Sequence, residues 1–324
     1  LPAADRVLAF ADGEVAFDGA PSPFLDWALA EVPPLATPGA SLFALAGLSP
    51  SPVGVKSARI RLGPRAVGGQ SDLQAAFDRP PVAAGKALRF RRLWHELPGG
   101  RAILRDVDLR FAPGERVALM GRNGAGKSTL LRHAKGLLEP TRGSVRAAGP
   151  VALLLQHPGD LLFAECVADE LPAEALAAAG LTTLRERHPR DLSGGERQRL
   201  ALAVAIHGGR EPAVVCLDEP TRGMDRARKG ELADEIDRLA TAGAAVLVAT
   251  HDPEFAVAFA DRVILLGEGT VIADGTAQEI LAGGWYFATE VARITRGAAL
   301  TVEQGAQTLA NIKGSDPLMR VVEA

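Results

Sequence analysis

Short apolar runs alternate with amphipathic stretches from residue 87 to about residue 284. The runs RVALM at 116–120 and AVVCL at 213–217 are continuous, as expected for strands buried on both faces of a sheet. The segment TLLRHAKGLL at 129–138 has helical spacing instead. Strands that alternate with helices in this way predict an α/β layer fold.

The rest of the chain is patterned less clearly. Residues 63–86 lack periodicity and contain several Gly and Pro, which predicts a linker. The last forty residues carry little pattern. The longest apolar runs, at 201–206 and 244–249, fit core elements, and none approaches the roughly 18–20 residues of a membrane helix.

A segment near the start of the chain is repeated later. Residues 4–25 and 260–281 match at a constant offset of 256 positions, and each predicts a strand, a glycine-centred turn, a second strand and a helix start. Two hairpins could converge by chance. The repeat includes Asp and Arg positions that hairpin geometry does not require, which favours a duplication. The identical pairs are Asp5/Asp261, Arg6/Arg262, Val7/Val263, Gly13/Gly269, Val15/Val271, Asp18/Asp274, Gly19/Gly275 and Leu25/Leu281.

Composition sets further limits. A length of 324 residues predicts about two domains. The net charge of -3 does not indicate a strongly basic surface, so no nucleic-acid partner is expected. The two cysteines, Cys166 and Cys216, make no disulfide framework, which favours a reducing cytosol. No signal peptide is evident. The sequence starts at Leu1 rather than Met, and we expect it to begin inside a longer protein.

The strongest chemical motif is GRNGAGKST, which matches G-x-x-x-x-G-K-[ST] between a predicted strand and a predicted helix. Its glycines let backbone N–H groups close around a polyphosphate, and the helix N-terminus adds partial positive charge. Lys127 can reach the terminal phosphates and Ser128 can bind magnesium. A glycine-rich turn with a solvated lysine is the alternative, and the full spacing disfavours it. The predicted ATP-binding residues are Gly121, Arg122, Asn123, Gly124, Ala125, Gly126, Lys127, Ser128 and Thr129.

The apolar run at 213–217 ends in two adjacent acids. Buried strands of α/β folds deliver ligand chemistry at their C-terminal ends. Asp218 is therefore a candidate magnesium ligand, usually through water, and Glu219 a candidate general base for an attacking water. A strand followed by an acidic turn would explain this segment as well if it stood alone.

The segment LSGGERQR at 192–199 leads into a helical pattern. Ser193, Gly194 and Gly195 are small residues at a predicted helix N-terminus, where an anion can bind. An ordinary N-cap followed by flexible glycines is an equally good explanation of these residues by themselves.

The order of phosphate loop, Gln156, LSGGERQ, LDEP, Asp225 and His251 resembles the ATP-binding cassette of transport ATPases over about 87–284. The resemblance implies an α/β P-loop NTPase fold with a mixed sheet core, a small antiparallel β subdomain and a helical subdomain. It implies ATP and Mg2+ as cofactors, with Ser128, Gln156 and Asp218 around the metal. By the same resemblance Gln156 senses the γ-phosphate, His251 hydrogen-bonds it, and Glu219, His251 and Gln156 form the catalytic set.

The resemblance also implies a partner cassette. Ser193, Gly194, Gly195 and Glu196 would bind the ATP held by the opposite cassette, and Asp225 would lie at the interface between the two. Two ATP molecules would be sandwiched and hydrolysed by an in-line water.

The stretch LLLQHPGDLLFAECVADEL at 153–171, together with EPTRGMD, resembles the ATPases of energy-coupling-factor importers of vitamins and transition-metal ions. The implied partners are a transmembrane coupling subunit and a small substrate-binding membrane subunit, with this protein peripheral on the cytoplasmic face of the cell membrane. Some members fuse two cassettes. We therefore expect residues 1–62 to end a preceding cassette, 63–86 to be a linker, 87–284 to be a complete cassette and 285–324 to be a C-terminal extension.

Three departures from the family pattern stand out. Leu97 occupies the place before Pro98-Gly99-Gly100 where an aromatic residue usually stacks on adenine, and Trp94 or His95 are possible substitutes. The helical segment between Gln156 and LSGGERQ is short, and Glu196 replaces a common glutamine. The alternatives are a cassette of another transporter subtype, a soluble tandem cassette acting on ribosomes or DNA, or a degenerate half-site that does not hydrolyse ATP.

Overall fold

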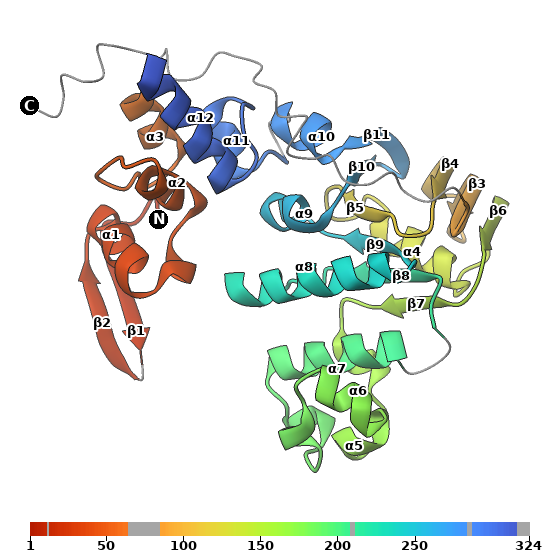
Figure 1. The fold of residues 1–324 in the computed structure, drawn as a ribbon. Helices are drawn as coiled ribbons and strands as arrows, with labels where there is room; N and C mark the ends of the chain where they lie inside the picture. Colours follow the sequence, from red (N-terminus) through yellow and green to blue (C-terminus); the bar gives the residue numbers. More distant parts are fainter. Residues whose placement is uncertain (12, 64–84, 208–210, 284–286, 316–324) are drawn as a thin grey trace, which may run out of the picture. The chain divides into compact units, whose positions relative to one another are not determined.

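The computed structural model describes residues 1–11, 13–63, 85–207, 211–283 and 287–315, which divide into two compact units (Figure 1). One unit lies within 79–276, and the other combines residues of 1–78 with residues of 277–324. Almost all of the predicted linker at 63–86 lies outside the described residues. Within the described ranges, no helix has the length and apolar character needed to cross a bilayer.

The 79–276 unit is built on a six-stranded mixed sheet in the order β11-β10-β5-β9-β8-β7. Neighbouring strands from β10 to β7 are parallel, and β11 pairs antiparallel with β10. The runs predicted as buried strands are β5 and β8, and both are almost entirely buried. The strands are β5 (Arg116–Met120), β7 (Val151–Leu154), β8 (Val214–Asp218), β9 (Ala245–Ala249), β10 (Arg262–Gly267) and β11 (Thr270–Thr276).

A second, three-stranded antiparallel sheet has the order β4-β3-β6, formed by β4 (Ala102–Phe111), β3 (Leu88–Glu96) and β6 (Arg142–Ala147). One hydrophobic cluster joins this sheet to helix α4 (Lys127–Lys135) and to the larger sheet. Phe90 and Phe111 meet edge to face within it, and Leu130 and Leu247 contribute from α4 and β9. The small sheet and the mixed sheet therefore hold α4 in a shared core.

Short helices form a separate region between β7 and β8. They are α5 (Val167–Glu170), α6 (Ala173–Ala178) and α7 (Gly194–His207), with single 3₁₀ turns between them. Val167, Leu176 and Leu200 belong to a hydrophobic cluster of this region alone. Helices α5 and α6 have only four and six residues, in keeping with the short helical segment expected from the sequence. Helices α8 (Arg226–Thr241) and α9 (Pro253–Phe259) complete the unit.

The second unit joins elements from the two ends of the chain. A hairpin of β1 (Val7–Ala11) and β2 (Glu14–Gly19) packs on α1 (Pro21–Glu31). Leu42, Phe43, Val291 and Ile294 belong to one buried cluster, so the N-terminal and C-terminal helices share a core. At Gly39 a Cβ would lie 2.9 Å from the Ile294 side chain, so the helices approach each other closely there. The remaining helices are α2 (Pro38–Leu45), α3 (Val55–Leu62), α10 (Ala277–Gly283), α11 (Glu290–Thr295) and α12 (Val302–Ser315).

The unit boundary differs slightly from the expected domain limits. The 79–276 unit ends with β11, so α10, which falls inside the expected cassette at 87–284, groups with the second unit. The helices from 38–62 and from 290–315, expected to end two separate cassettes, form one joint core.

Both copies of the sequence repeat are hairpins with the same register. Val7 pairs with Gly19 as Val263 pairs with Gly275, and the register shifts after Ala9 and after Leu265, which occupy equivalent positions. Each copy also carries a cross-strand ion pair: Arg6 Nε lies 2.6 Å from Asp18 Oδ1, and Arg262 Nε lies 2.5 Å from Asp274 Oδ1. A shared bulge and a shared ion pair favour duplication over chance convergence.

Candidate functional site

The loop between β5 and α4 is shaped by glycines with positive φ. Gly121 has a φ of 150°, and a Cβ there would lie 2.2 Å from Leu266 O. Gly126, the left-handed N-cap of α4, has a φ of 104°, and a Cβ would lie 2.8 Å from the Leu104 side chain. Larger residues would displace β10 or the small sheet. The loop therefore keeps its backbone N–H groups at the start of α4, the arrangement that binds anions.

Lys127 is the first residue of α4 and is buried. Its Nζ donates to the carbonyl oxygens of Gly121 at 2.7 Å and Arg122 at 3.3 Å. Burial lowers the pKa of this ammonium group, and attraction to Glu219 and Asp218 partly opposes that shift. The amine is thus folded back over the loop, held by oxygen atoms that a phosphate can replace.

Asp218 ends β8 and is almost completely buried. Burial raises the pKa of its carboxyl group, while a hydrogen bond with Ser128 and the charge of Lys127 lower it. Its Oδ1 is buried and has no hydrogen-bond partner. A buried oxygen without a partner, beside a hydroxyl group, is an incomplete polar site that is suited to a cation or an ordered water.

Glu219 follows Asp218 with a φ of 49°, an unusual backbone conformation for a residue other than glycine. Its N–H donates to Ala249 O at 2.9 Å, so the end of β9 helps to hold the turn. Its Oε2 lies 2.7 Å from Nδ1 of His251, which follows β9. Because β8 and β9 are adjacent and parallel, the strand ends bring the carboxylate and the imidazole together.

The other two predicted residues in this half of the site are less constrained. Gln156 lies two residues beyond β7, at the same edge of the sheet, and is exposed. Asp225 is the N-cap of α8, where its Oδ1 accepts from the Arg228 N–H at 2.9 Å. The side chain of Asp225 therefore has a structural role within its own turn in addition to any role at an interface.

Ser193 and Glu196 form a reciprocal cap at the start of α7. Ser193 Oγ accepts from the Glu196 N–H at 3.3 Å, and Glu196 Oε2 accepts from the Ser193 N–H at 2.8 Å. The hydrogen bond to Ser193 lowers the pKa of the Glu196 carboxyl. Among the described residues, no hydrogen bond or ion pair joins Ser193, Gly194, Gly195 or Glu196 to the cluster around Lys127. These four residues thus belong to a second, separate corner of the unit.

One contact that the sequence did not reveal joins the two corners. Gln198, on α7, is buried and its Nε2 donates to Pro220 O at 3.0 Å. Pro220 directly follows Glu219, so the capped helix is tied to the turn that holds the carboxylate. In the sequence, Gln198 is the final glutamine of LSGGERQ. Neither its spacing from other motifs nor its charge predicted the contact with Pro220.

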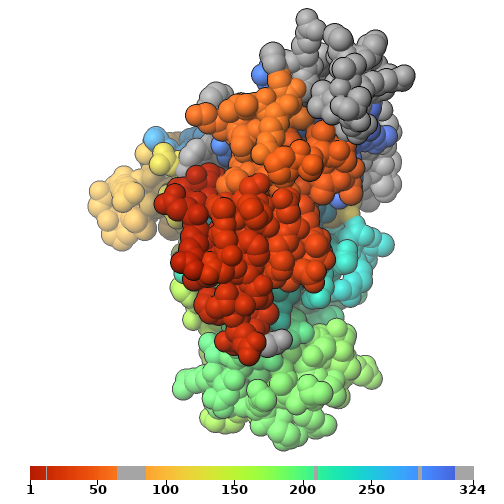
Figure 2. Space-filling model, turned by 90° about the vertical axis from the view of Figure 1, so that its left-hand side faces the viewer, coloured from red at the N-terminus to blue at the C-terminus, as the bar shows by residue number. Residues whose placement is uncertain are grey.

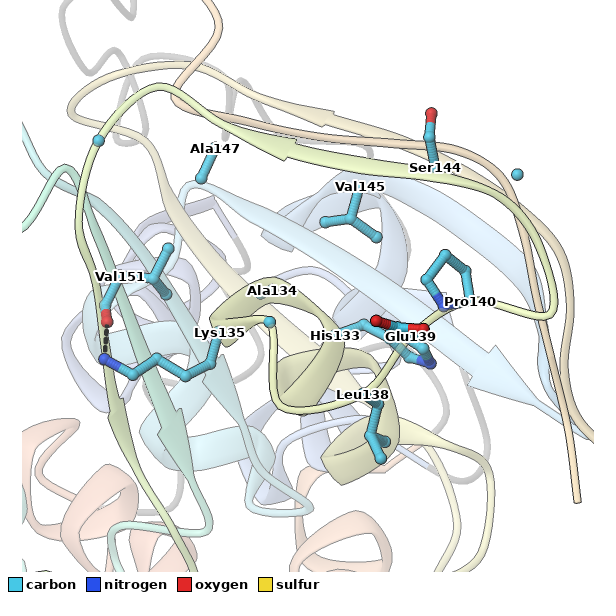
Figure 3. Close-up of a pocket in the computed structure, with 13 residues that line it drawn as sticks. His133, Ala134, Lys135, Leu138, Glu139, Pro140, Ser144, Val145, Ala147 and Val151 are labelled. Atoms are coloured by element: carbon cyan, nitrogen blue, oxygen red, sulfur yellow. Dashed lines mark hydrogen bonds between the residues drawn. The ribbon is translucent and has the colours of Figure 1, made fainter.

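The rings near Leu97 are occupied by other contacts. Leu97 lies exposed in a turn closed by its N–H to Arg101 O at 2.9 Å. The guanidinium of Arg142 lies 5.6 Å from the centre of the Trp94 ring, and His95 packs edge to face on His133 with ring centres 4.8 Å apart. His133 lies on α4, in the region drawn in Figure 3. Both rings therefore already make contacts with other side chains, Trp94 with Arg142 and His95 with His133.

The end of α4 is fastened to the mixed sheet. Lys135 Nζ donates to Val151 O, the contact marked by the dashed line in Figure 3. Burial lowers the pKa of His133 to about 4, so this imidazole is neutral at physiological pH. These contacts at its far end fix the helix whose N-terminus carries Lys127 and Ser128.

Comparison with known proteins agrees with this geometry. The sequence model of the ABC transporter family matches residues 104–222. The cobalt import ATP-binding protein CbiO of Rhodobacter capsulatus is 37% identical over 233 residues, which cover 62% of this chain and 81% of CbiO. The chain belongs to the ABC transporter ATP-binding family, a family of ATPases.

More particular relatives include an ABC transporter ATP-binding protein of Streptomyces coelicolor, 37% identical over 353 residues. That match covers 90% of this chain and 61% of the relative, so the chain spans about three fifths of the relative's length. Among solved structures, CbiO1 of Clostridium perfringens, part of the transporter complex CbiONQ, gives a TM-score of 0.54 at 26% identity. The structural match covers 61% of this chain and 91% of CbiO1. The expected cassette fold, with its mixed sheet, antiparallel sheet and helical region, is thereby confirmed.

Proposed function

We propose that this chain binds and hydrolyses ATP to energise an importer of the energy-coupling-factor type, whose cargo is a vitamin or a transition-metal ion. The observation that carries the proposal is the convergence of Lys127, Ser128 and Asp218 with the Glu219–His251 pair at one edge of the sheet. The similarity to CbiO, named for cobalt import, supports the importer class.

The residues present fit a magnesium-bound nucleoside triphosphate. Gly121 and Gly126 leave space where a Cβ would fill the loop. Among the described residues, the hydrogen bonds of Lys127 Nζ go to two carbonyl oxygens, which phosphate oxygens can replace. Ser128 and Asp218 offer a hydroxyl and a carboxylate, the hard oxygen ligands that Mg2+ takes while keeping several waters. When bound, magnesium would neutralise charge between the phosphates. Gln156 is the third proposed residue around the metal.

Hydrolysis needs a group that orients water and accepts its proton. His251 holds Oε2 of Glu219, which leaves Oε1 as the oxygen that accepts the proton from an attacking water. The strained backbone of Glu219 fixes the direction of this carboxylate without help from the substrate. His251 is otherwise exposed, and we assign its remaining nitrogen to the γ-phosphate. Lys127 and the loop N–H groups bind the phosphates and keep them in line.

A complete site requires a second cassette. Ser193, Gly194, Gly195 and Glu196 lie in a different corner from Lys127, so they serve the ATP of a partner cassette, and Asp225 lies between the two. We further propose that residues 1–62 end such a cassette within one longer polypeptide. The matched hairpin registers and the greater length of the Streptomyces relative support this arrangement.

The membrane partners follow from the same assignment. A transmembrane coupling subunit and a small substrate-binding subunit would receive the motion of the cassettes, with this protein peripheral on the cytoplasmic face. CbiO1, part of the complex CbiONQ, supports partners of this kind. Co-purification of the protein with small multi-span membrane proteins tests the assignment. Recovery with ribosomes or DNA instead would overturn it.

Replacing Lys127 by Ala should abolish nucleotide binding, because the buried cation and its phosphate contacts are lost. We expect a loss of affinity of at least about 100-fold, in line with a charge-assisted contact of roughly 3 kcal/mol. Titration with a fluorescent ATP analogue measures it. Lys56→Ala, which removes an exposed lysine of the other unit, is the matched control and should bind as the parent does.

Replacing Glu219 by Gln should stop hydrolysis but retain ATP binding. The amide keeps the shape and can still hydrogen-bond to His251, yet it cannot accept a proton. We expect turnover to fall by about 100-fold or more, measured by phosphate release, with unchanged analogue binding. Turnover equal to that of the parent protein would remove Glu219 from the role of base.

A further inference from the structure

Three arginines form a row across the small antiparallel sheet. Arg89 on β3 pairs with Arg110 on β4 and with Arg146 on β6. Neighbouring strands lie about 4.8 Å apart, so the three side chains leave the sheet side by side. Together with Arg91, Arg92 and Arg142 on the same sheet, they make up what we call the arginine face.

The arginine row points away from the core. The next rows in the sheet, Phe90 with Leu109 and Leu88 with Phe111, are buried in the cluster shared with α4. Side chains alternate between faces along a strand, so Arg89, Arg110 and Arg146 lie on the opposite side. Figure 3 shows this alternation on β6, where Val145 points toward α4 and Ser144 points away from it.

This arrangement is unfavourable for the isolated sheet. Like charges directly opposite one another in a sheet destabilise it. Within the described residues, none of the three row arginines has an acidic partner, whereas Arg116 and Arg262 elsewhere pair with Asp261 and Asp274. Arg89 Nε is moreover buried without an acceptor. The chain as a whole has a net charge of -3, so general basicity does not explain the row.

A shallow hollow of about 510 Å³ adjoins the row. Arg91, Arg92 and Arg142 line it, together with Trp94 and Asp106. Asp108, the other acid on this side of β4, accepts from the Arg92 N–H at 3.3 Å. Glu96 also lies 3.9 Å from the Arg142 guanidinium, so the acids balance the arginines of the hollow itself and the excess of positive charge comes from the row of Arg89, Arg110 and Arg146.

We propose that the arginine face docks onto the headgroups of anionic phospholipids. Guanidinium groups bind phosphate through paired N–H donors, and a basic surface is attracted to an anionic leaflet. A row of side chains on one face of a sheet can engage several headgroups at once, and tryptophan suits the boundary between water and lipid. A single-stranded nucleic acid needs a free ring for base stacking, but Arg142 already lies over Trp94.

The inference rests on the membrane-transport role proposed above, and vesicle binding tests it without nucleotide or turnover. The experiment is co-sedimentation of the full chain with vesicles of phosphatidylcholine alone or with added phosphatidylglycerol, which makes the surface anionic. Partitioning should require the anionic lipid and should fall steeply between low and high salt, as a screened charge interaction does.

The decisive variant is the triple change Arg89→Gln, Arg110→Gln and Arg146→Gln. It should lose about 100-fold in partitioning, since each basic residue near a charged leaflet contributes roughly fivefold. Its thermal midpoint should not fall, because the change removes repulsion within the row. The matched control, Arg185→Gln with Arg190→Gln and Lys56→Gln, removes the same charge from exposed positions elsewhere and should retain vesicle binding.

Three results would overturn the proposal. The first is equal partitioning of the triple variant and the parent protein, and the second is an equal loss in the control variant. The third is tight binding of a single-stranded oligouridine that anionic vesicles fail to displace, which would assign the face to nucleic acid. Loss of vesicle binding with normal ATP turnover would leave the proposed enzyme function intact and would support the docking surface.

Discussion

The hairpins β1–β2 and β10–β11 have the same register, the same bulge and the same Arg–Asp pair, but they meet different surroundings. Ile264 and Leu266 are 0% and 2% exposed in the shared core of the cassette. Their equivalents Leu8 and Phe10 are 50% and 68% exposed. Figure 2 shows the N-terminal segment, which includes this hairpin, in dark red.

The two hairpins share their local structure but differ in how much of their surface distant parts of the chain bury. The opposite face of β1–β2 packs on α1 through Val7, Ala9 and Phe17. One face of this hairpin is therefore covered by the helix that follows it in sequence. Among the described residues, nothing buries the Leu8–Phe10 face, whereas its equivalent, Ile264 with Leu266, lies in the core shared with α4 and the small sheet. An exposed apolar face of this kind marks a surface suited to a partner, and in the arrangement proposed above the preceding cassette would cover it.

The largest difference in stability between the two hairpins is expected when equivalent apolar side chains, Leu266 and Phe10, are truncated to alanine. Leu266→Ala removes buried atoms and should cost about 2–5 kcal/mol of the free energy of unfolding of the cassette unit. Phe10→Ala should change stability little, because Phe10 is already in contact with solvent. Urea unfolding followed by hydrogen exchange of peptides from each unit measures both. Comparable losses in the two variants would mean that Phe10 is covered in solution.

The turn glycines should show an intermediate effect. Gly13 and Gly269 have nearly the same φ, 85° and 81°, but a Cβ at Gly269 would lie 2.3 Å from Ile103 O and nothing lies within 4 Å at Gly13. Gly13→Ala should cost only the left-handed strain of about 1–2 kcal/mol. Gly269→Ala adds a clash with β4, for a total of about 2–3 kcal/mol.

A second readout sharpens the glycine pair. The Gly269 N–H donates to Ala125 O of the phosphate loop at 3.2 Å, so Gly269→Ala should also weaken binding of a fluorescent ATP analogue. The matched Gly13→Ala variant should bind the analogue as the parent does. Equal affinity for the ATP analogue in both variants would show that the β10–β11 turn does not influence the phosphate loop.

The smallest difference in stability is expected from removal of the cross-strand ion pairs, Arg262–Asp274 and Arg6–Asp18. Arg262 is mostly buried and also bonds to Glu115 at 2.8 Å, and its side-chain bonds to Asp274 and Glu115 raise its pKa. Arg262→Gln should cost about 1–2 kcal/mol, since it leaves buried acceptors without a charged donor. Arg6 is exposed, so Arg6→Gln should leave the urea midpoint unchanged. A measurable loss at Arg6 would indicate that its hairpin is covered.

Sequence reasoning was most successful where local patterns are sufficient. The phosphate loop, the buried strand before it and the carboxylates at the end of β8 were predictable, because strand ends and glycine spacing fix them. The hairpin repeat was visible in residue identities alone. The resemblance to a family implied catalytic roles for Glu219 and His251 separately. Their contact depends on the order of the strands and was not predicted from the sequence.

Other features depended on contacts between distant segments. The joint core of α2 and α3 with α11 and α12 joins stretches of weak periodicity, so no local signal announces it. The arginine row is invisible until register is known, because Arg89, Arg110 and Arg146 are far apart in sequence. Trp94 and His95 remained open as stacking residues until their contacts with Arg142 and His133 were seen.

The hydrogen bond from Gln198 to Pro220 has a consequence for timing between two active sites. The helix that bears Gln198 begins at the residues proposed to bind a partner cassette's nucleotide, and Pro220 adjoins Glu219, the proposed base of this chain's own site. In that proposed arrangement, a rotation of the helical region would either move Glu219 with it or break this bond. The nucleotide state of one site would then influence hydrolysis at the other.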